Sequence, residues 1–127
     1  MNLNDFLFRG KITETGVWVE GVAFPHDNGR VTMFRQHPMD GSLIGNEVDP
    51  DTVGRYSGLS DINGTKIFEG DLVKLAEHDA IFEVRVVDGS WECRNEQPWK
   101  SRSHKLEFDS SLAKYEVVGS IHNNPNY

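Results

Sequence analysis

The sequence predicts a mainly β protein, and two observations carry that prediction. No stretch of the 127 residues repeats its apolar side chains every 3.6 positions, which is the pattern of an amphipathic helix. Instead, short runs alternate apolar and polar residues, and turn-forming pairs such as Asn28-Gly29 and Asn63-Gly64 separate them. We therefore expect strands joined by tight turns, and no helix longer than about two turns.

Residues 1–56 are expected to form a small β-rich region around an N-terminal hairpin. Residues 8–12 and 17–24 alternate like strands across a short gap, and residues 31–35 make a third short strand. Residues 36–51 hold two Pro, two Gly and four acidic residues. This composition is typical of a mobile loop, with room for one short strand.

Residues 57–127 are expected to form a small SH3-like β-barrel. The runs that suit its strands and one helical turn are 72–75, 81–87, 90–94, 104–108 and 115–121, with the turn at 109–114. Asn63-Gly64 should be a tight turn with Gly64 at positive φ. Gly70 and Asp71 should lead into the first barrel strand, with the Asp71 side chain accepting a hydrogen bond from a nearby backbone N–H.

The composition limits the classes of partner and compartment. Thirteen basic and twenty acidic residues give a net charge of −7, which disfavours general binding to phosphate backbones. A single cysteine, Cys93, cannot form an internal disulfide and fits a reducing cytosol. The N-terminus does not read as a signal peptide, and no apolar run reaches membrane-spanning length. We expect a cytoplasmic protein.

A search for reactive motifs predicts no catalytic residue, no metal site and no cofactor. The five histidines lack metal-binding spacing, and the sequence has no nucleophile elbow or glycine-rich phosphate loop. Glu69 and Asp71 are two residues apart and would share one face of a strand, where they could form an acid/base or metal pair. A turn that opens a strand explains them better. Cys93 follows Trp91 in a predicted strand, where packing is the usual role of a thiol.

Two groups of residues are candidates for contact with a partner. Residues 94–105 form a predicted polar loop with a local excess of positive charge, in which aromatic and basic side chains could track a single-stranded nucleic acid. Its candidate contact residues are Arg94, Trp99, Lys100, Arg102 and Lys105. Trp18, Val22 and Phe24 lie on one face of the predicted strand 17–24, and Val17, Val19 and Ala23 lie on the other. Because no amphipathic helix is available to cover the second face, we expect Trp18, Val22 and Phe24 to form an oligomer interface.

Three parts of the chain resemble the YopX-like family of bacteriophage and prophage proteins. The central block is residues 56–73 (YSGLSDINGTKIFEGDLV), the N-terminal part is residues 8–21, and the closing strand is residues 115–125 (YEVVGSIHNNP). The resemblance implies small β-rich domains, a temperate-phage or prophage origin and expression in the bacterial cytoplasm. It implies no activity and no catalytic residues.

These observations favour a phage accessory protein that acts as a non-enzymatic protein-binding or assembly module. Such a module would form homo-oligomers and contact a phage or host protein, with no role for a membrane. One alternative is a nucleic-acid-associated factor that uses the loop at 94–105. A weaker alternative is an enzyme of unrecognised type that uses scattered carboxylates.

Overall fold

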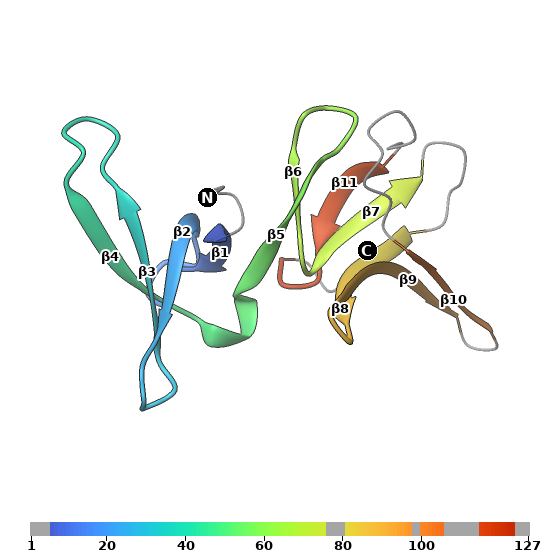
Figure 1. Cartoon of the computed structure of the whole chain (residues 1–127), viewed down its shortest axis with the longest axis horizontal. Helices are drawn as coiled ribbons and strands as arrows, with labels where there is room; N and C mark the ends of the chain where they lie inside the picture. The colour runs from blue at the N-terminus through green and yellow to red at the C-terminus, as the bar shows by residue number, and fades with distance from the viewer. Residues whose placement is uncertain (1–5, 76–80, 98–99, 106–114, 124–127) are drawn as a thin grey trace. The chain divides into compact units, whose positions relative to one another are not determined.

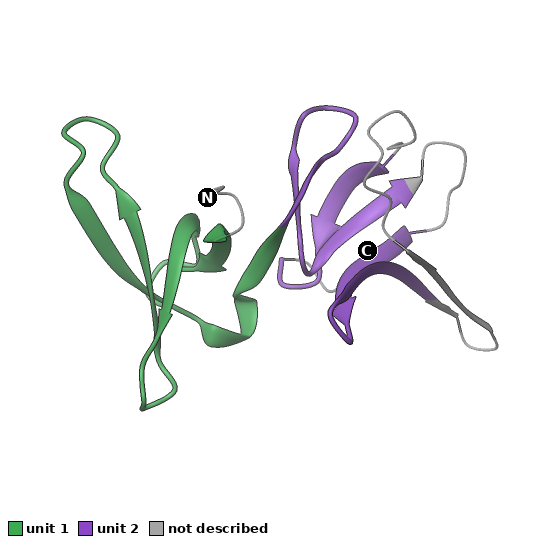
Figure 2. Cartoon of the chain, in the orientation of Figure 1, with its two compact units in different colours: residues 1–56 green, residues 57–127 purple. Residues whose placement is uncertain are grey.

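The computed structural model describes residues 6–75, 81–97, 100–105 and 115–123, and most of these residues lie in strands (Figure 1). Helical residues in these ranges occur only in short 3₁₀ turns, such as η2 (Pro50–Thr52). The predicted mainly β class and the lack of long helices are therefore confirmed for the described part of the chain. The chain divides into two compact units, Met1–Tyr56 and Ser57–Tyr127 (Figure 2).

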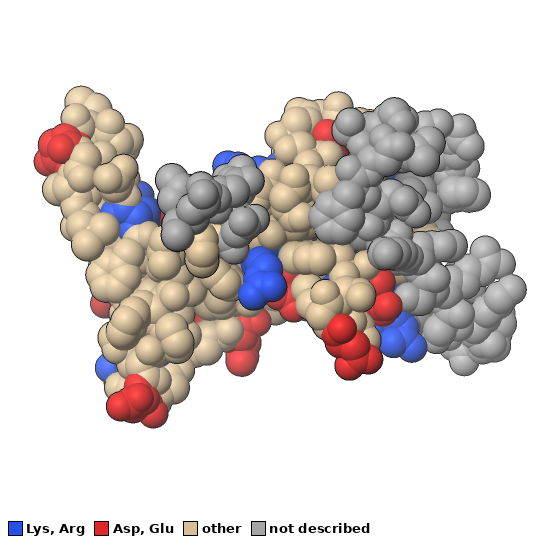
Figure 3. Space-filling view, in the orientation of Figure 1, with Lys and Arg blue, Asp and Glu red and all other residues tan. Residues whose placement is uncertain are grey.

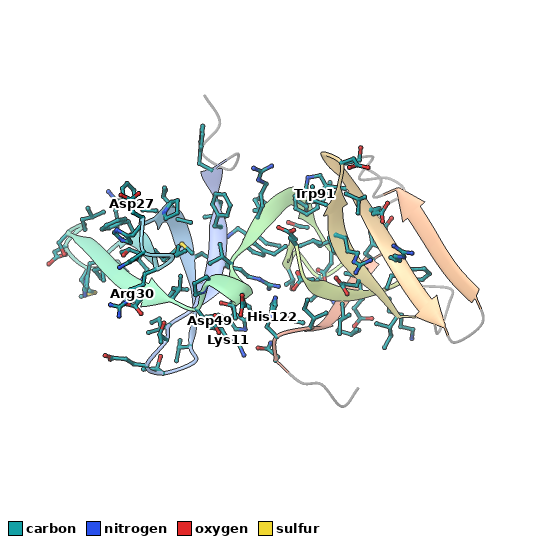
Figure 4. All side chains as sticks on the ribbon, turned by 90° about the horizontal axis from the view of Figure 1, so that it is seen from below. Lys11, Asp27, Arg30, Asp49, Trp91 and His122 are labelled. Atoms are coloured by element: carbon teal, nitrogen blue, oxygen red, sulfur yellow. The ribbon has the colours of Figure 1, made fainter. Side chains whose placement is uncertain are left out.

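Unit 1 is an antiparallel sheet with the strand order β4-β3-β2-β1-β5. Its strands are β1 (Phe8–Lys11), β2 (Trp18–Pro25), β3 (Val31–Gln36), β4 (Leu43–Val48) and the start of β5 (Gly54–Ser60). The sheet curls until the end of β1 meets the end of β4. There Ile12 bridges to Val48, and the Asp49 N–H donates to the Lys11 carbonyl at 2.8 Å. Figure 4 shows Lys11 and Asp49 side by side at this point.

Strand β4 lies where the sequence left room for one short strand within residues 36–51. All six of its residues pair in register with β3, from Val31 opposite Val48 to Gln36 opposite Leu43. Asp49 then caps the turn η2 by accepting the Asp51 N–H at 3.0 Å. The segment is a strand and a capped turn because β3 supplies a complete ladder, which outweighs the low strand propensity of Gly and Asn.

The core of unit 1 lies on the concave side of this sheet. Val19, Met33 and Val48 are buried at its centre. The side chains that pack around them are Phe8, Ile12, Ala23, Val31 and Val53. Strand alternation places Val19 and Ala23 inward, as the sequence predicted. Gly10 leaves room for this packing, because a Cβ atom there would lie 3.2 Å from Val48.

Unit 2 combines the β5–β6 hairpin with a five-stranded antiparallel sheet of order β10-β9-β8-β7-β11. Its strands are β6 (Lys66–Phe68), β7 (Asp71–Leu75), β8 (Ile81–Val87), β9 (Ser90–Gln97), β10 (Lys100–Lys105) and β11 (Tyr115–Ser120). In the described residues β10 and β11 are the two edges of an open sheet. The described residues therefore do not show the expected closed SH3-like barrel, because no ladder among them joins these two edges.

The core of unit 2 lies between the hairpin and the sheet. Leu59 on β5 and Ile67 on β6 are buried against residues of the five-stranded sheet, which places two layers around one core. The buried residues of the sheet are Val73, Phe82, Val84, Cys93 and Tyr115. Trp91 and Val117 pack at the margin of this cluster.

The turn at Asn63-Gly64 has the predicted geometry. Gly64 has a φ of 82°, and its N–H donates to the Asp61 carbonyl at 3.0 Å. The Asp61 N–H donates to the Thr65 carbonyl at 2.7 Å and closes the loop. This pattern is a type I turn followed by a left-handed residue, which is a common three-residue hairpin connection. The prediction for Gly64 is confirmed.

Candidate functional site

One side of the unit 1 sheet exposes apolar side chains, and we call it the outer face. It carries Trp18, Val22 and Phe24 on β2, which point away from the buried Val19. The register of β2, β3 and β4 adds Phe34, opposite Val22, and Leu43, opposite Gln36. Val22 is 55% exposed, Phe24 54% and Leu43 71%. The outer face therefore carries apolar side chains on three strands, with the exposed Glu20 between Trp18 and Val22 on β2.

The aromatic rings of the outer face contact one another. The Phe24 and Phe34 rings meet edge to face, with 6.5 Å between centroids and an interplanar angle of 77°. The Phe34 ring also lies over Gly45, since a Cβ atom at Gly45 would come within 2.9 Å of the Phe34 Cε1 atom. His26 adds a third ring, 5.1 Å from Phe24. These contacts hold the exposed rings in defined positions on the sheet.

Trp18 lies at the basic end of the outer face. The Arg9 Cζ atom is 4.4 Å from the centroid of the Trp18 ring, and the Lys11 Nζ atom is 5.4 Å from it. Both distances are typical of cation–π contacts. Trp18 is half-buried, so part of its ring is covered by cations of its own unit. The most exposed apolar area of β2 is therefore at Val22 and Phe24.

Figure 3 shows how charge is distributed on one side of the molecule. On unit 1, acidic atoms gather at the tips of the β2–β3 and β3–β4 loops, and most of the surface between them is uncharged. Arg30, which precedes β3, and Glu47 on β4 form an exposed ion pair of 3.6 Å. An exposed pair of this kind adds little stability, but it neutralises the carboxylate at this end of β4.

The predicted loop at residues 94–105 is instead part of a β-hairpin. Strand β9 continues to Gln97 and β10 begins at Lys100. The register pairs Arg94 with Ser103, Arg102 with Asn95, Lys100 with Gln97 and Lys105 with Glu92. Trp99 lies outside the described residues, and for Lys100, Arg102 and Lys105 the structure describes the backbone alone. The candidate contact residues therefore follow two paired strands.

Arg94 lines a small open hollow on the five-stranded sheet. The hollow has a volume of about 170 Å³. Its lining is Leu72, Ile81, Glu83, Arg85 and Arg94. The Arg85 Nε atom is 3.1 Å from the Glu83 Oε2 atom, so an ion pair forms part of the lining. The hollow is too small to hold most cofactors or drug-sized ligands.

Asp61 holds the β5–β6 hairpin to the last strand of the sheet. Its Oδ1 atom accepts the backbone N–H groups of Asn63 and Thr65, both at 2.8 Å. Its Oδ2 atom accepts the N–H of Val117 on β11 at 2.9 Å. Burial acts to raise the pKa of the Asp61 carboxyl, but these three hydrogen bonds outweigh it and lower the pKa below 3.8. The carboxylate is a structural tie between distant segments.

Gly70 and Asp71 have the structural role that the sequence predicted. Gly70 has a φ of 91°, and its backbone bonds to Val84 and to Ile121 at 2.9 and 3.0 Å. Asp71 begins β7, and its Oδ2 atom accepts the Phe68 N–H at 2.8 Å. Asp71 is 1% exposed, so this bond is made inside the unit. The Glu69-Gly70-Asp71 segment is therefore a turn that opens a strand.

Cys93 packs inside unit 2. Its side chain is 1% exposed, and burial raises the pKa of the thiol to about 12. A thiol with this pKa is almost entirely protonated at neutral pH and is a poor nucleophile. The packing role expected for Cys93 agrees with its place in the core.

Two further findings concern the described residues only. They contain no group of three or more His, Cys, Asp and Glu side chains placed to hold a metal ion. None of the helical segments in these ranges is long and apolar enough to cross a membrane.

Comparison with known proteins gives the family. Residues 7–127 match the family model described as YopX protein. The chain belongs to the YopX family. The YopX-family fold is also seen in the crystal structure of the protein yopX from Bacillus subtilis, which matches with a TM-score of 0.55 at 14% sequence identity. The match covers 96% of this chain and 97% of that one. No curated protein matches this chain in sequence.

Sequence analysis did not single out three residues that contribute to the surfaces and contacts described above. Leu43 was missed because its segment resembles a loop. Phe34 was missed because the sequence did not predict how β3 pairs with β2 and β4. Both could be found only through the β2–β3–β4 register. Asp61 had a usable signal, because an Asp two residues before Asn-Gly often accepts hydrogen bonds from the turn that follows.

Proposed function

We propose that this YopX-family chain is a non-enzymatic protein-binding module that assembles with copies of itself through the outer face of unit 1. The observation that carries the proposal is the exposure of Val22, Phe24 and Leu43, each more than half exposed, on one side of one sheet. A contiguous apolar patch on a small domain is typical of a protein contact surface. Phe24 and Phe34 supply the rigid aromatic anchors that such contacts favour.

Self-association would bury the exposed apolar side chains of the outer face, and this burial is favourable. Covering apolar area contributes about 25 cal/mol per Å², so several exposed side chains and their neighbours give a substantial driving force. A specific interface of this kind should bury more than about 1,000 Å² in total. The cations beside Trp18 lie at the rim of the patch, where polar groups are usual.

A pair of matched valine variants tests the proposal. Val22→Glu places a charge inside the outer face, whereas Val17→Glu places the same charge at a 57% exposed valine that precedes β2. We expect light scattering to give the same oligomer mass for the unmodified protein and for Val17→Glu, and a smaller mass for Val22→Glu. Because Val22 is already 55% exposed, its substitution should leave the circular dichroism spectrum unchanged. A monomer mass for the unmodified protein at high concentration would contradict the proposal.

The proposal extends to the origin of the protein, its further partners and its location. Family membership supports a phage or prophage accessory role with a phage or host protein as a further partner, and the single cysteine supports a cytoplasmic location. The nucleic-acid alternative for residues 94–105 predicts a salt-dependent shift with single-stranded DNA or RNA. No described contact favours that alternative over protein binding.

A further inference from the structure

Strand β4 is the last strand of the unit 1 sheet, and part of its outer edge is unpaired within the described residues. The His37 N–H donates to the Ser42 carbonyl at 2.7 Å, which makes these two residues a bonded pair of the β3–β4 ladder. Bonded and non-bonded pairs alternate along an antiparallel ladder. Leu43, Gly45 and Glu47 therefore direct their backbone groups away from β3. The Glu47 carbonyl confirms this direction, since it accepts the Thr13 N–H at 3.0 Å.

The edge lacks the features that usually prevent strand pairing. Residues 43–46 read Leu-Ile-Gly-Asn, with no Pro, no Lys and no bulge in the register with β3. They carry no charge, and Glu47 beyond them is paired with Arg30. Because the chain has a net charge of −7, two copies repel wherever their acidic surfaces meet. An uncharged edge is where a second copy can approach with the least electrostatic repulsion.

We propose that this edge pairs with β4 of a second copy, antiparallel and centred on Ile44, so that the two sheets become continuous. The inference rests on the self-association in the proposed function and adds a second contact beside the outer face. In this register Leu43 of each copy is opposite Gly45 of the other, and each pair exchanges two backbone hydrogen bonds. The total is four bonds around a two-fold axis, as expected for a closed dimer contact.

The neighbouring registers are excluded by contacts within the unit. A register centred on Gly45 would place Leu43 opposite Glu47, whose carbonyl already accepts the Thr13 N–H. A register centred on Leu43 would require Gly41 to be extended, but Gly41 has a φ of 73° in the β3–β4 loop. The register centred on Ile44 uses the outward groups of Leu43 and Gly45 and requires no change in either loop.

The side chains favour the same register. Gly45 has no side chain, and the Phe34 ring lies over it on the outer face. Leu43, 71% exposed, would lie on the outer face directly beside Gly45 of the second copy and cover the edge of that ring. A large apolar residue across from a glycine is a known way to stabilise a strand pair. On the other side of the sheet, Ile44 would face Ile44 of the second copy across a non-bonded pair, where side chains come closest.

Cysteine cross-linking tests this register. At the two-fold axis the Cα atoms of the two copies of residue 44 would be about 4.5 Å apart, which lies within the range that a disulfide spans. Ile44→Cys should therefore form a disulfide-linked dimer on oxidation. Asn46→Cys is the control, because its two copies would be four residues apart along the pair, or roughly 13 Å. The native Cys93 is buried and should not react.

A second pair of variants tests the edge without cross-linking. Leu43→Lys places at the edge the kind of charge that blocks strand pairing, and Met39→Lys places the same charge at an 88% exposed loop residue. We expect Leu43→Lys to weaken self-association by at least about tenfold and Met39→Lys to leave it unchanged.

The outcomes separate this inference from the proposed function. If the unmodified protein self-associates while Ile44→Cys stays monomeric after oxidation, or while Asn46→Cys cross-links equally well, the edge pairing is wrong and outer-face assembly stands. If Ile44→Cys cross-links and Val22→Glu has the same mass as the unmodified protein, the edge is supported and the outer face is not an interface. If the unmodified protein is monomeric and Ile44→Cys does not cross-link, both ideas fail.

Discussion

Asp61 makes three backbone hydrogen bonds with one carboxylate, and two of them lie in the turn that it begins. The third reaches Val117, which is 56 residues further along the chain. A carboxylate suits this position because it accepts several N–H groups at once, whereas a neutral side chain with one acceptor atom satisfies fewer of them. The residue thereby joins a local turn to a distant strand.

Replacing Asp61 should measure the strength of this tie. Asp61→Ala leaves the N–H groups of Asn63, Thr65 and Val117 without their acceptor, so we expect the free energy of unfolding to fall by at least about 2 kcal/mol. Asp27→Ala is the control, because Asp27 is exposed in the β2–β3 turn and its loss should change stability by less than about 0.5 kcal/mol. Urea denaturation followed by circular dichroism gives both values. Equal stability of the two variants would refute the structural role.

The lowered pKa of Asp61 gives this role a defined pH dependence. A carboxyl whose pKa is lower in the folded than in the unfolded chain adds stability above its unfolded pKa of about 3.9, and this stability is lost as the pH falls through the folded pKa. The unmodified protein should therefore exceed Asp61→Asn in stability at pH 7, and the difference should shrink below pH 4. Thermal melting of both proteins from pH 7 to pH 2.5 tests this. A difference that grows in acid would contradict it.

At the scale of elements, close approach of β2 and β3 depends on Gly21. A Cβ atom at Gly21 would lie 2.2 Å from the Phe34 carbonyl oxygen, which is backbone and cannot move without disturbing the ladder. At Gly45 on β4 the nearest atom, at 2.9 Å, belongs to the Phe34 ring, which is a side chain that can turn. These two glycines lie on the strands that flank β3 and therefore face different constraints.

Alanine substitution at the two glycines should separate these constraints. We expect Gly21→Ala to lower the free energy of unfolding by about 2 kcal/mol or more, because β2 and β3 must shift apart. Gly45→Ala should cost less than about 1 kcal/mol, since rotation of the Phe34 ring relieves the contact. Chemical denaturation of the two variants gives the comparison. A larger loss for Gly45→Ala would mean that the β2–β3 spacing is not the limiting contact.

The elements that sequence analysis found are those with a local signal. The turn at Gly64 and the strand that begins at Asp71 follow from residues within a few positions of each other. Strand β4 was expected only as one short strand inside a loop, because Gly45 and Asn46 have low strand propensity and only the ladder to β3 makes the segment extended. The segment from Asn95 to Gln97 was read as a loop for the same reason, since it has no apolar alternation and is extended through its pairing with β10.

At the scale of the whole molecule, the open sheet of unit 2 marks where local patterns stop being informative. Alternation predicts strands, but whether a sheet closes into a barrel depends on which distant strands pair and how they are staggered. Neither is encoded in the spacing of apolar residues. The outer face was predicted in part, through Val22 and Phe24. The contributions of Phe34 and Leu43 depend on the register of three strands.

The secondary structure of the complete chain can be checked directly. We expect the far-ultraviolet circular dichroism spectrum to have a single minimum near 215–218 nm, as is usual for sheets, and helix content below about one tenth. The expectation rests on the lack of a 3.6-residue apolar period anywhere in the 127 residues. A spectrum with strong minima at about 208 and 222 nm would contradict the fold class.

The position of β11 in the sheet has a consequence for synthesis. Strands β7, β8 and β9 each pair with the next one along the chain, so these hairpins can form as the chain leaves the ribosome. Strand β11 instead returns to pair with β7, and its Val117 is the third donor to Asp61. Until β11 has emerged, one edge of β7 lacks the strand that pairs with it. The Asp61 carboxylate then lacks its third donor, the Val117 N–H. Nascent chains halted before residue 115 should therefore be easily cleaved by proteases in unit 2, and chains halted well beyond residue 120 should resist.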